Sequence, residues 1–271
     1  MTEISDTFLE LENKNEAALI AYVTVGDPNT KKTLRFVSAL IEGGVDIVEL
    51  GIPFSDPIAD GPTIQNAVSR SLAGGCKPID AFNVASSIRE RHEIPLVAMT
   101  YFNPVFRMGI ARFLTLGKKA GFSGLIIPDL PIEGSQSYRN ACASKEVDTI
   151  FLAAPSTDES RLKRIASVTS GYLYLVSLYG VTGARNTLTQ DSVKLVERCS
   201  NLLRDRLPFA VGFGISRPEQ VRRLVRAGAN GVIVGSAFVN IIAENIHNTP
   251  QASRKLQKLA RTLKRETRMN Q

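Results

Sequence analysis

The sequence predicts an α/β fold, and most specifically a (β/α)8 TIM barrel, from three observations. Short apolar runs rich in Val, Ile and Leu alternate with longer amphipathic segments, as parallel strands buried on both faces alternate with helices. Eight such alternations fit in 271 residues, and this barrel commonly takes about 250 residues. No interior stretch has the composition of a linker, so residues 1–271 are predicted to form one barrel domain. A doubly wound open sheet is the alternative.

The expected strands follow turns or helix-ending glycines. In order they are Leu19–Val25, Asp46–Leu50, Leu96–Thr100, Gly124–Pro128, Asp148–Ala153, Tyr172–Ser177, Phe209–Gly212 and Gly231–Val234. Helical patterns lie between them, among others at Lys31–Glu42, Gly109–Ala120, Glu133–Lys145 and Pro218–Ala227. The stretch from Pro62 to His92 is long enough for two helices with a break at Gly74 and Gly75.

One extra helix is expected at each end of the chain. The first lies around Thr7–Glu12, and the second occupies the last 21 residues, which hold seven basic residues and one acid. The net charge of the whole chain is +7, so the basic excess is a property of this tail. Its leucines recur at helical spacing, which indicates an amphipathic helix with a basic outer face. The tail has no aromatic residue for base stacking, so no nucleic-acid partner is expected.

Composition excludes several classes of protein. A hydrophobic fraction of 44% and a charged fraction of 22% are ordinary for a globular protein. No apolar run approaches the roughly 18 residues of a membrane span, and the acidic N-terminus is unlike a signal peptide, so we expect a cytoplasmic protein. The three cysteines form no C-x-x-C pair, and only two histidines occur, so no metal site is expected.

Glu49 is the first candidate for catalysis, because the C-terminal strand ends of such a barrel form its active site. Alternation along the second strand puts Glu49 on the face opposite Val48 and Leu50. If those two side chains face the helices, Glu49 points into the barrel mouth. Desolvation there would raise its pKa toward the range useful for proton transfer. A structural glutamate paired with a cation is the alternative.

The loop after the second strand is stiff and acidic. It reads PFSDPIADGP from Pro53 to Pro62, and Pro62 is suited to the first turn of a helix. Two aspartates and three prolines thus stand at the catalytic end of the predicted barrel. Asp56 and Asp60 are candidates for the site, and turn or capping residues are the alternative interpretation.

Glycines after the seventh and eighth strands predict a phosphate site. The seventh strand runs into Gly212-Phe213-Gly214, and the eighth into Gly235-Ser236 ahead of a helix. Backbone N–H groups can approach an anion closely at such positions, and the helix dipole favours it. An arginine stands where the third glycine of G-x-G-x-x-G would be, so the dinucleotide fingerprint fails.

The segment Gly180–Arg185, after the sixth strand, is flanked by glycines and polar. It suits a lid that closes over a phosphorylated substrate, and a long surface loop is the alternative. No lysine lies in the core of the eight strands, which argues against a Schiff-base aldolase.

Seven motifs together resemble the tryptophan synthase α subunit family. The most specific is VELGIPFSDPIADGPTIQNA, and the others are AYVTVGDP, MTYFNPVF, LIIPDLP, GVTGAR, VGFGIS and VIVGSA. The resemblance implies a (β/α)8 barrel lyase of tryptophan biosynthesis. It would cleave indole-3-glycerol phosphate into indole and glyceraldehyde 3-phosphate by a retro-aldol reaction without metal or Schiff base.

The resemblance also implies residue roles. Glu49 would be the acid–base residue, and Asp60 would accept a hydrogen bond from the indole N–H. The indole slot and lid would comprise Tyr22, Ile64, Met99, Asp129, Tyr174, Thr182 and Phe213. The phosphate would contact Gly183, Gly212, Gly214, Gly235 and Ser236.

A partner follows from the same resemblance. The family works with a β subunit that carries pyridoxal phosphate and receives indole through a tunnel, so an α2β2 complex is expected and no cofactor belongs to this chain. Pro53, Asp56 and Pro57 would contact that subunit. Two other functions stay open on the residues alone: another phosphate-binding barrel enzyme, or a non-catalytic barrel that activates a partner.

Overall fold

The computed structural model describes residues 2–176, 190–203, 206–212 and 214–269. Within these ranges all strands belong to one parallel sheet, in the order β5-β4-β3-β2-β1-β9-β8-β7-β6. The strands are β1 (Ala18–Thr24), β2 (Ile47–Gly51), β3 (Leu96–Met99), β4 (Phe122–Ile126), β5 (Asp148–Ile150), β6 (Leu152–Ala153), β7 (Leu173–Val176), β8 (Phe209–Gly212) and β9 (Gly231–Val234).

The sheet has nine strands because one segment of the chain, 148–153, forms two short strands that close the barrel. The sequence predicts one strand over 148–153, but the structure divides it at Phe151 into β5, which pairs with β4, and β6, which pairs with β7. The backbone N–H of Tyr174 donates to the carbonyl of Phe151 over 3.0 Å. The two short strands therefore link β4 to β7 without a break in the chain. The expected α/β barrel is therefore the observed architecture, and the open-sheet alternative is wrong.

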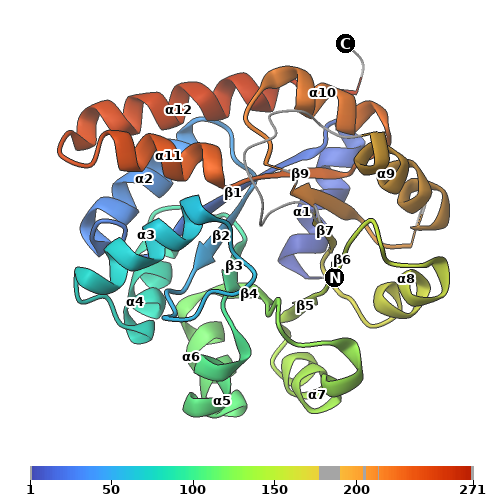
Figure 1. The fold of residues 1–271 in the computed structure, drawn as a ribbon, viewed down its shortest axis with the longest axis horizontal. Helices are drawn as coiled ribbons and strands as arrows, with labels where there is room; N and C mark the ends of the chain where they lie inside the picture. Colours follow the sequence, from blue (N-terminus) through green and yellow to red (C-terminus); the bar gives the residue numbers. More distant parts are fainter. Residues whose placement is uncertain (1, 177–189, 204–205, 213, 270–271) are drawn as a thin grey trace.

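Helices form a ring around the sheet (Figure 1). The described helices are α1 (Glu3–Asn13), α2 (Thr30–Glu42), α3 (Pro62–Ala73), α4 (Pro78–Arg89), α5 (Phe102–Met108), α6 (Ile110–Ala120), α7 (Gln136–Ser144), α8 (Glu159–Ala166), α9 (Gln190–Leu203), α10 (Pro218–Arg226), α11 (Ser236–Glu244) and α12 (Thr249–Arg265), with a 3-10 turn at Ile132–Gly134. Helix α5 is not among the helical segments named from the sequence, and its Pro104 lies in the first turn, where proline is tolerated. The division into domains stays a prediction.

Strand alternation produces two apolar layers. One face of each strand packs toward the helices in the larger cluster, and the opposite face fills the barrel interior, where Ile20, Ile47 and Val97 meet. Helix α1 contributes Ile4 and Phe8 to this interior cluster and so covers the N-terminal ends of the strands. Because α1 closes that end, the opposite end, where the βα loops lie, remains for a site.

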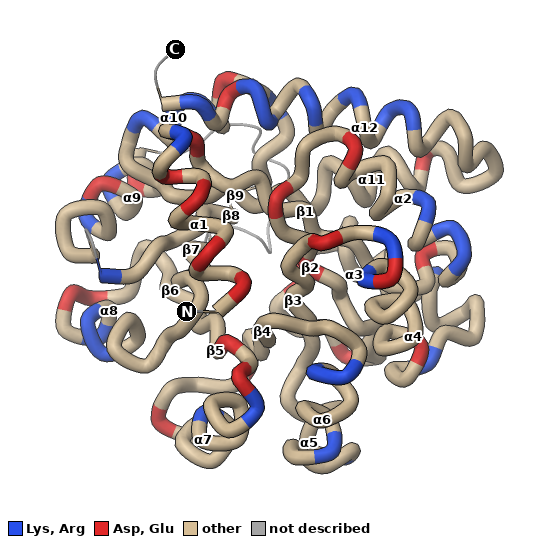
Figure 2. Tube along the Cα trace, turned by 180° about the vertical axis from the view of Figure 1, so that it is seen from behind, with Lys and Arg blue, Asp and Glu red and all other residues tan. Residues whose placement is uncertain are grey.

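The basic tail forms α12, which packs along α2 on the outside of the ring. Lys and Arg follow one another along its outer face (Figure 2). Lys264 is the exception, since it turns inward to Asp46 at 2.9 Å and to Glu16 at 3.1 Å. In the described ranges, no helix is long and apolar enough to cross a membrane.

Candidate active site

Glu49 lies in the barrel interior, as strand alternation predicts. It is 0% exposed and stands in register between Tyr22 of β1 and Val97 of β3. The Tyr172 hydroxyl donates to Glu49 Oε1 over 2.5 Å, while Oε2 is buried without a hydrogen-bond partner among the described residues. Glu49 forms no ion pair with any described residue. The alternative, a structural glutamate paired with a cation, therefore has no support in these residues.

Burial decides the ionisation of Glu49. It raises the pKa of this carboxyl from 4.5 to about 7, and the hydrogen bond from Tyr172 opposes the shift. A carboxyl with this pKa exists in both protonation states near neutral pH. It can therefore donate and accept a proton within one turnover.

Asp60 is half-buried on the loop between β2 and α3. Its Oδ2 accepts a hydrogen bond of 3.0 Å from the Tyr101 hydroxyl, and the same hydroxyl accepts the backbone N–H of Ala59 at 2.9 Å. Gln65 donates from Nε2 to the Asp60 carbonyl at 2.8 Å. Burial raises the pKa of Asp60 to about 6, and the bond from Tyr101 opposes the shift.

The two carboxyl groups share one environment. The pKa of Tyr22 and that of Tyr174 are both raised by burial first and then by the negative charges of Glu49 and Asp60. Tyr22 also stands in register beside Glu49, and charges affect a pKa in this way only at short range, so these four side chains lie near one another at the barrel mouth. Sequence reasoning placed all four in one site, from β1, β2, β7 and the loop after β2.

An apolar wall borders this space. Tyr22 packs in one cluster with Ala67 and Val239, against which Ile64 and Met99 also pack. Met99 belongs to the barrel interior cluster too, as does Tyr174. The predicted slot residues Tyr22, Ile64 and Met99 therefore lie together, on β1, α3 and β3.

The glycines at the strand ends lie against the slot tyrosines. A side chain at Gly235 would start 3.4 Å from Tyr22 Cβ, and one at Gly212 would start 2.7 Å from the Tyr174 hydroxyl. Gly235 directly precedes α11, which begins at Ser236 without a side-chain cap, so backbone N–H groups there are open to an anion. Gly214 has a φ of +67° and open space around it.

Some predicted site residues cannot be placed. Thr182, Gly183 and Phe213 lie outside the described residues. Asp129 is exposed, and its Oδ1 accepts the backbone N–H of Phe102 at 2.8 Å, at the start of α5. Asp129 therefore caps the start of α5, beside Tyr101. Tyr101 itself stands two residues after Met99 of the slot wall.

The predicted partner-contact residues of the same loop differ in their exposure to solvent. Pro53 is buried, whereas Asp56 is exposed and its Oδ2 accepts from the Ser55 hydroxyl at 2.5 Å. Ile58 is 77% exposed, which is unusual for a large apolar side chain. The middle of the loop is therefore exposed to solvent, whereas Asp60 near its end is half-buried at the barrel mouth.

Sequence reasoning missed Tyr172 and Tyr101, which hold the two carboxyl groups. Alternation could have found Tyr172, because it stands two residues before Tyr174 and therefore on the same strand face. Tyr101 had no comparable signal, since it follows β3 outside any regular period. The two histidines, His92 and His247, lie in the connections after α4 and α11.

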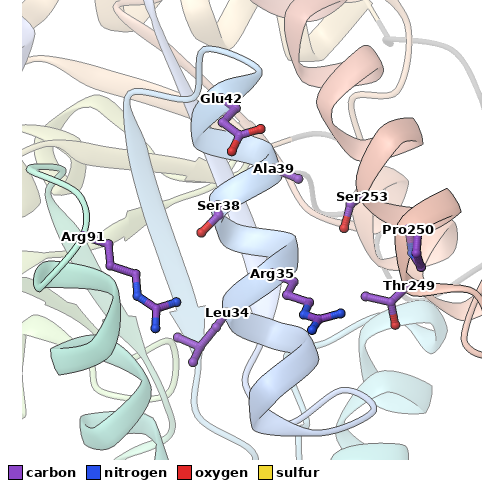
Figure 3. A pocket seen from close by; sticks show the side chains of 9 residues that line it. All are labelled: Leu34, Arg35, Ser38, Ala39, Glu42, Arg91, Thr249, Pro250 and Ser253. Atoms are coloured by element: carbon purple, nitrogen blue, oxygen red, sulfur yellow. The ribbon is translucent and has the colours of Figure 1, made fainter.

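Two hollows lie away from this space. The first, of about 280 Å3, lies along α2 between Arg91 and the start of α12, and Figure 3 shows the side chains that line it. The second, of about 720 Å3, opens at the N-terminal strand ends beside Thr2 and Asp148. Neither is lined by a predicted site residue. In the described ranges no three His, Cys, Asp or Glu side chains form a group that could hold a metal ion.

Comparison with known proteins gives one consistent result. The family model described as tryptophan synthase alpha chain matches residues 8–268. The tryptophan synthase alpha chain of Methanosarcina barkeri is 48% identical over 97% of this chain and 96% of its own, and that of Pyrococcus abyssi is 46% identical over 90% and 98%. A solved mutant tryptophan synthase alpha-subunit from Pyrococcus furiosus superposes with a TM-score of 0.85 at 41% identity, covering 92% of this chain and 98% of that one. A chain from the tryptophan synthase complex of the same organism has the same TM-score and coverage at 40% identity.

Proposed function

The chain belongs to the tryptophan synthase alpha chain family, and we propose how the groups at its barrel mouth carry out the alpha reaction. That reaction is the retro-aldol cleavage of indole-3-glycerol phosphate to indole and glyceraldehyde 3-phosphate, and the chain is a lyase of tryptophan biosynthesis. The observation that carries the proposal is the fully buried carboxyl group of Glu49, whose Oε2 has no partner among the described residues, near the half-buried carboxyl group of Asp60.

Glu49 is the proton donor and acceptor of the proposed mechanism. Its protonated form gives a proton to C3 of the indole ring, which leaves a positive charge on the ring nitrogen. The resulting carboxylate then takes the proton of the neighbouring hydroxyl as the carbon–carbon bond breaks, so that the hydroxyl carbon becomes the aldehyde and the bonding electrons return to the ring. Glu49 ends protonated, and a pKa of about 7 supports both halves of this cycle.

Asp60 stabilises the charge that develops on the ring nitrogen. As a carboxylate it accepts the indole N–H, and this hydrogen bond strengthens when the nitrogen becomes positive. Tyr22, Ile64, Met99 and Tyr174 form the walls of the slot for the ring, with Asp129, Thr182 and Phe213 completing it on the family pattern.

The phosphate group of the substrate is proposed to bind at the ends of β8 and β9. Gly235 and Ser236 present the open N-terminus of α11, which favours an anion. Gly214 has open space around it, which allows close approach of its backbone to the anion, and Gly212 joins it on the family pattern. Gly183 joins them on the family pattern.

The partner is proposed to be the tryptophan synthase β subunit in an α2β2 complex. The exposed side chains of Asp56 and Ile58, with the half-buried Pro57 between them, are accessible to such a partner and support a contact there on the family pattern. We assign pyridoxal phosphate to that partner and no cofactor to this chain, and we propose a cytoplasmic location without nucleic-acid or membrane binding.

One assay tests the function. The purified chain is incubated with indole-3-glycerol phosphate, and indole release is followed with and without β subunit. We expect slow release by the chain alone and faster release in the complex. Absence of indole in both conditions would reject the proposal. A sugar-phosphate isomerase, which is the alternative barrel enzyme, would instead convert a triose or pentose phosphate without releasing indole.

A further inference from the structure

Tyr101 stands at the junction between the rigid barrel and the loop that carries Asp60. It follows β3 and directly precedes the first residue of α5. Its neighbours on both sides are bonded to the end of β4 and the residues beyond: the N–H of Thr100 donates to the Ile126 carbonyl at 3.1 Å, and that of Phe102 to Asp129 at 2.8 Å. The backbone of Tyr101 is therefore fixed by the sheet.

The Tyr101 hydroxyl makes two contacts with the loop. It donates its single proton to Asp60 Oδ2 at 3.0 Å and accepts the N–H of Ala59 at 2.9 Å. Its ring also packs on Phe54 with a centroid separation of 5.6 Å. One side chain, 5% exposed, thus contacts the loop near its beginning and at its end.

We propose that Tyr101 is the positioning residue of the alpha reaction, which holds the carboxyl group of Asp60 in place at the barrel mouth. This inference rests on the proposed function, because it takes Asp60 as the partner of the ring nitrogen. Tyr101 acts through Asp60 and not on the substrate.

The geometry supports this assignment over a purely structural one. The hydrogen bond from the Tyr101 hydroxyl fixes the orientation of the Asp60 carboxyl group. Removing the hydroxyl would leave Asp60 Oδ2 and the N–H of Ala59 without this partner, so the loop could move. A misplacement of about 1 Å can cost about 10²-fold in rate.

The same bond bears on ionisation. Among the described residues, the phenols of Tyr22, Tyr101 and Tyr174 and the carboxyl group of Glu49 lie near Asp60. Burial raises the pKa of Asp60, and the bond from Tyr101 lowers it. Loss of the hydroxyl should therefore move the pKa of Asp60 further up. The carboxylate would then be lost at a higher pH.

The experiment compares Tyr101→Phe with Tyr138→Phe in the full chain with β subunit. Tyr138 is a matched control, since it is equally buried and its hydroxyl donates to the Leu125 carbonyl at 3.2 Å, away from the loop. We expect Tyr101→Phe to lower kcat by about 10–10²-fold with little change in KM, from the cost of misplacement. The acid limb of its pH–rate profile should move to higher pH, and Tyr138→Phe should behave as wild type.

A second measurement does not depend on activity. Carbon-13 NMR of aspartate-labelled protein follows the Asp60 carboxyl, assigned with Asp60→Asn, in wild type and Tyr101→Phe. The pH at the midpoint of the Asp60 carboxyl titration should be higher in Tyr101→Phe than in wild type. Wild-type kcat and an unshifted acid limb in Tyr101→Phe would overturn the inference while the proposed function stands. If wild type released no indole, the proposed function would fail. An Asp60 titration midpoint that is the same in Tyr101→Phe and wild type would then also overturn the effect of Tyr101 on Asp60.

Discussion

The Tyr172 hydroxyl donates a hydrogen bond of 2.5 Å to Glu49 Oε1, and both side chains are completely buried in the barrel. The bond joins the start of the chain's seventh strand to the middle of its second. It orients one oxygen of Glu49 toward the interior, while Oε2 has no protein partner among the described residues. On the proposed function this unpartnered oxygen is the one that meets the substrate, because a buried carboxylate oxygen without a bond is costly until something pairs with it.

The first prediction concerns proton transfer. Glu49→Gln preserves shape and can still accept the bond from Tyr172, but it cannot donate and take back a proton. Indole release should fall by at least about 10²-fold, the usual size of a proton-transfer contribution. The assay is indole release in the complex, with circular dichroism as the control for folding. A folded variant that retains most activity would remove Glu49 from the chemistry.

The second prediction concerns stability and pH. The pKa of Glu49 is about 7 in the folded protein and 4.5 ordinarily, so between these values the folded state binds more protons than the unfolded chain. Stability therefore falls as pH rises through this window, and the loss is complete above it. Glu49→Gln does not ionise, so at pH 8 it should be more stable than wild type by up to about 3 kcal/mol.

Urea unfolding of both proteins at pH 8 and pH 4 checks this expectation. The difference between variant and wild type at pH 4 should be smaller by the same amount, since Glu49 is then protonated in both states. Other ionisable groups cancel because they are the same in the two proteins. A difference that is equal at both pH values would contradict the raised pKa.

The third prediction concerns the phosphate site. Gly235 has a φ of −115°, which other residues adopt, so a side chain there tests access and not backbone strain. Gly235→Val should raise KM about tenfold or more, because a branched side chain blocks hydrogen bonds to an anion that are worth about 1.5–3 kcal/mol each. Calorimetry with glycerol 3-phosphate should show the same loss.

A control keeps this test specific. Gly134, at the end of the 3-10 turn, has only Leu130 within 4.0 Å of the place where a Cβ would lie. Gly134→Val should bind glycerol 3-phosphate like wild type. If Gly235→Val bound it equally well, the phosphate would lie elsewhere.

The fourth prediction concerns the partner. Asp56 is exposed in the middle of the loop that ends at Asp60. Asp56→Ala should leave the slow rate of the isolated chain nearly unchanged and reduce the activation by β subunit, because the proposed function places Asp56 against the partner and away from the substrate. Indole release with no β subunit and with saturating β subunit measures both quantities.

The outcomes of this test separate the roles. Glu12→Ala, which removes an exposed acid from α1 at the other end of the barrel, should leave rate and activation unchanged. An equal loss for Asp56→Ala in both conditions would put Asp56 in the chemistry. An unchanged activation ratio would remove it from the interface.

Much of the fold follows from local patterns. The apolar runs and the glycines after helices predict the strands to within a few residues, because parallel strands buried on both faces need continuous apolar sequence. The fifth strand is an exception: its division at Phe151 depends on which neighbour each half pairs with, and pairing is a property of the closed sheet. Helix α5 is another, since it is stabilised by Asp129 from the next strand end.

The sequence by itself determined the barrel, the inward direction of Glu49 and the motifs that identify the family, because alternation and glycine placement are local properties of the chain. Only the tertiary structure decided the state of the two acids. Glu49 has a pKa of about 7 because all the strands around it exclude water, and its contact with Tyr172 spans 123 residues. Asp60 depends likewise on Tyr101, 41 residues away. Desolvation and such distant contacts arise only when the barrel closes.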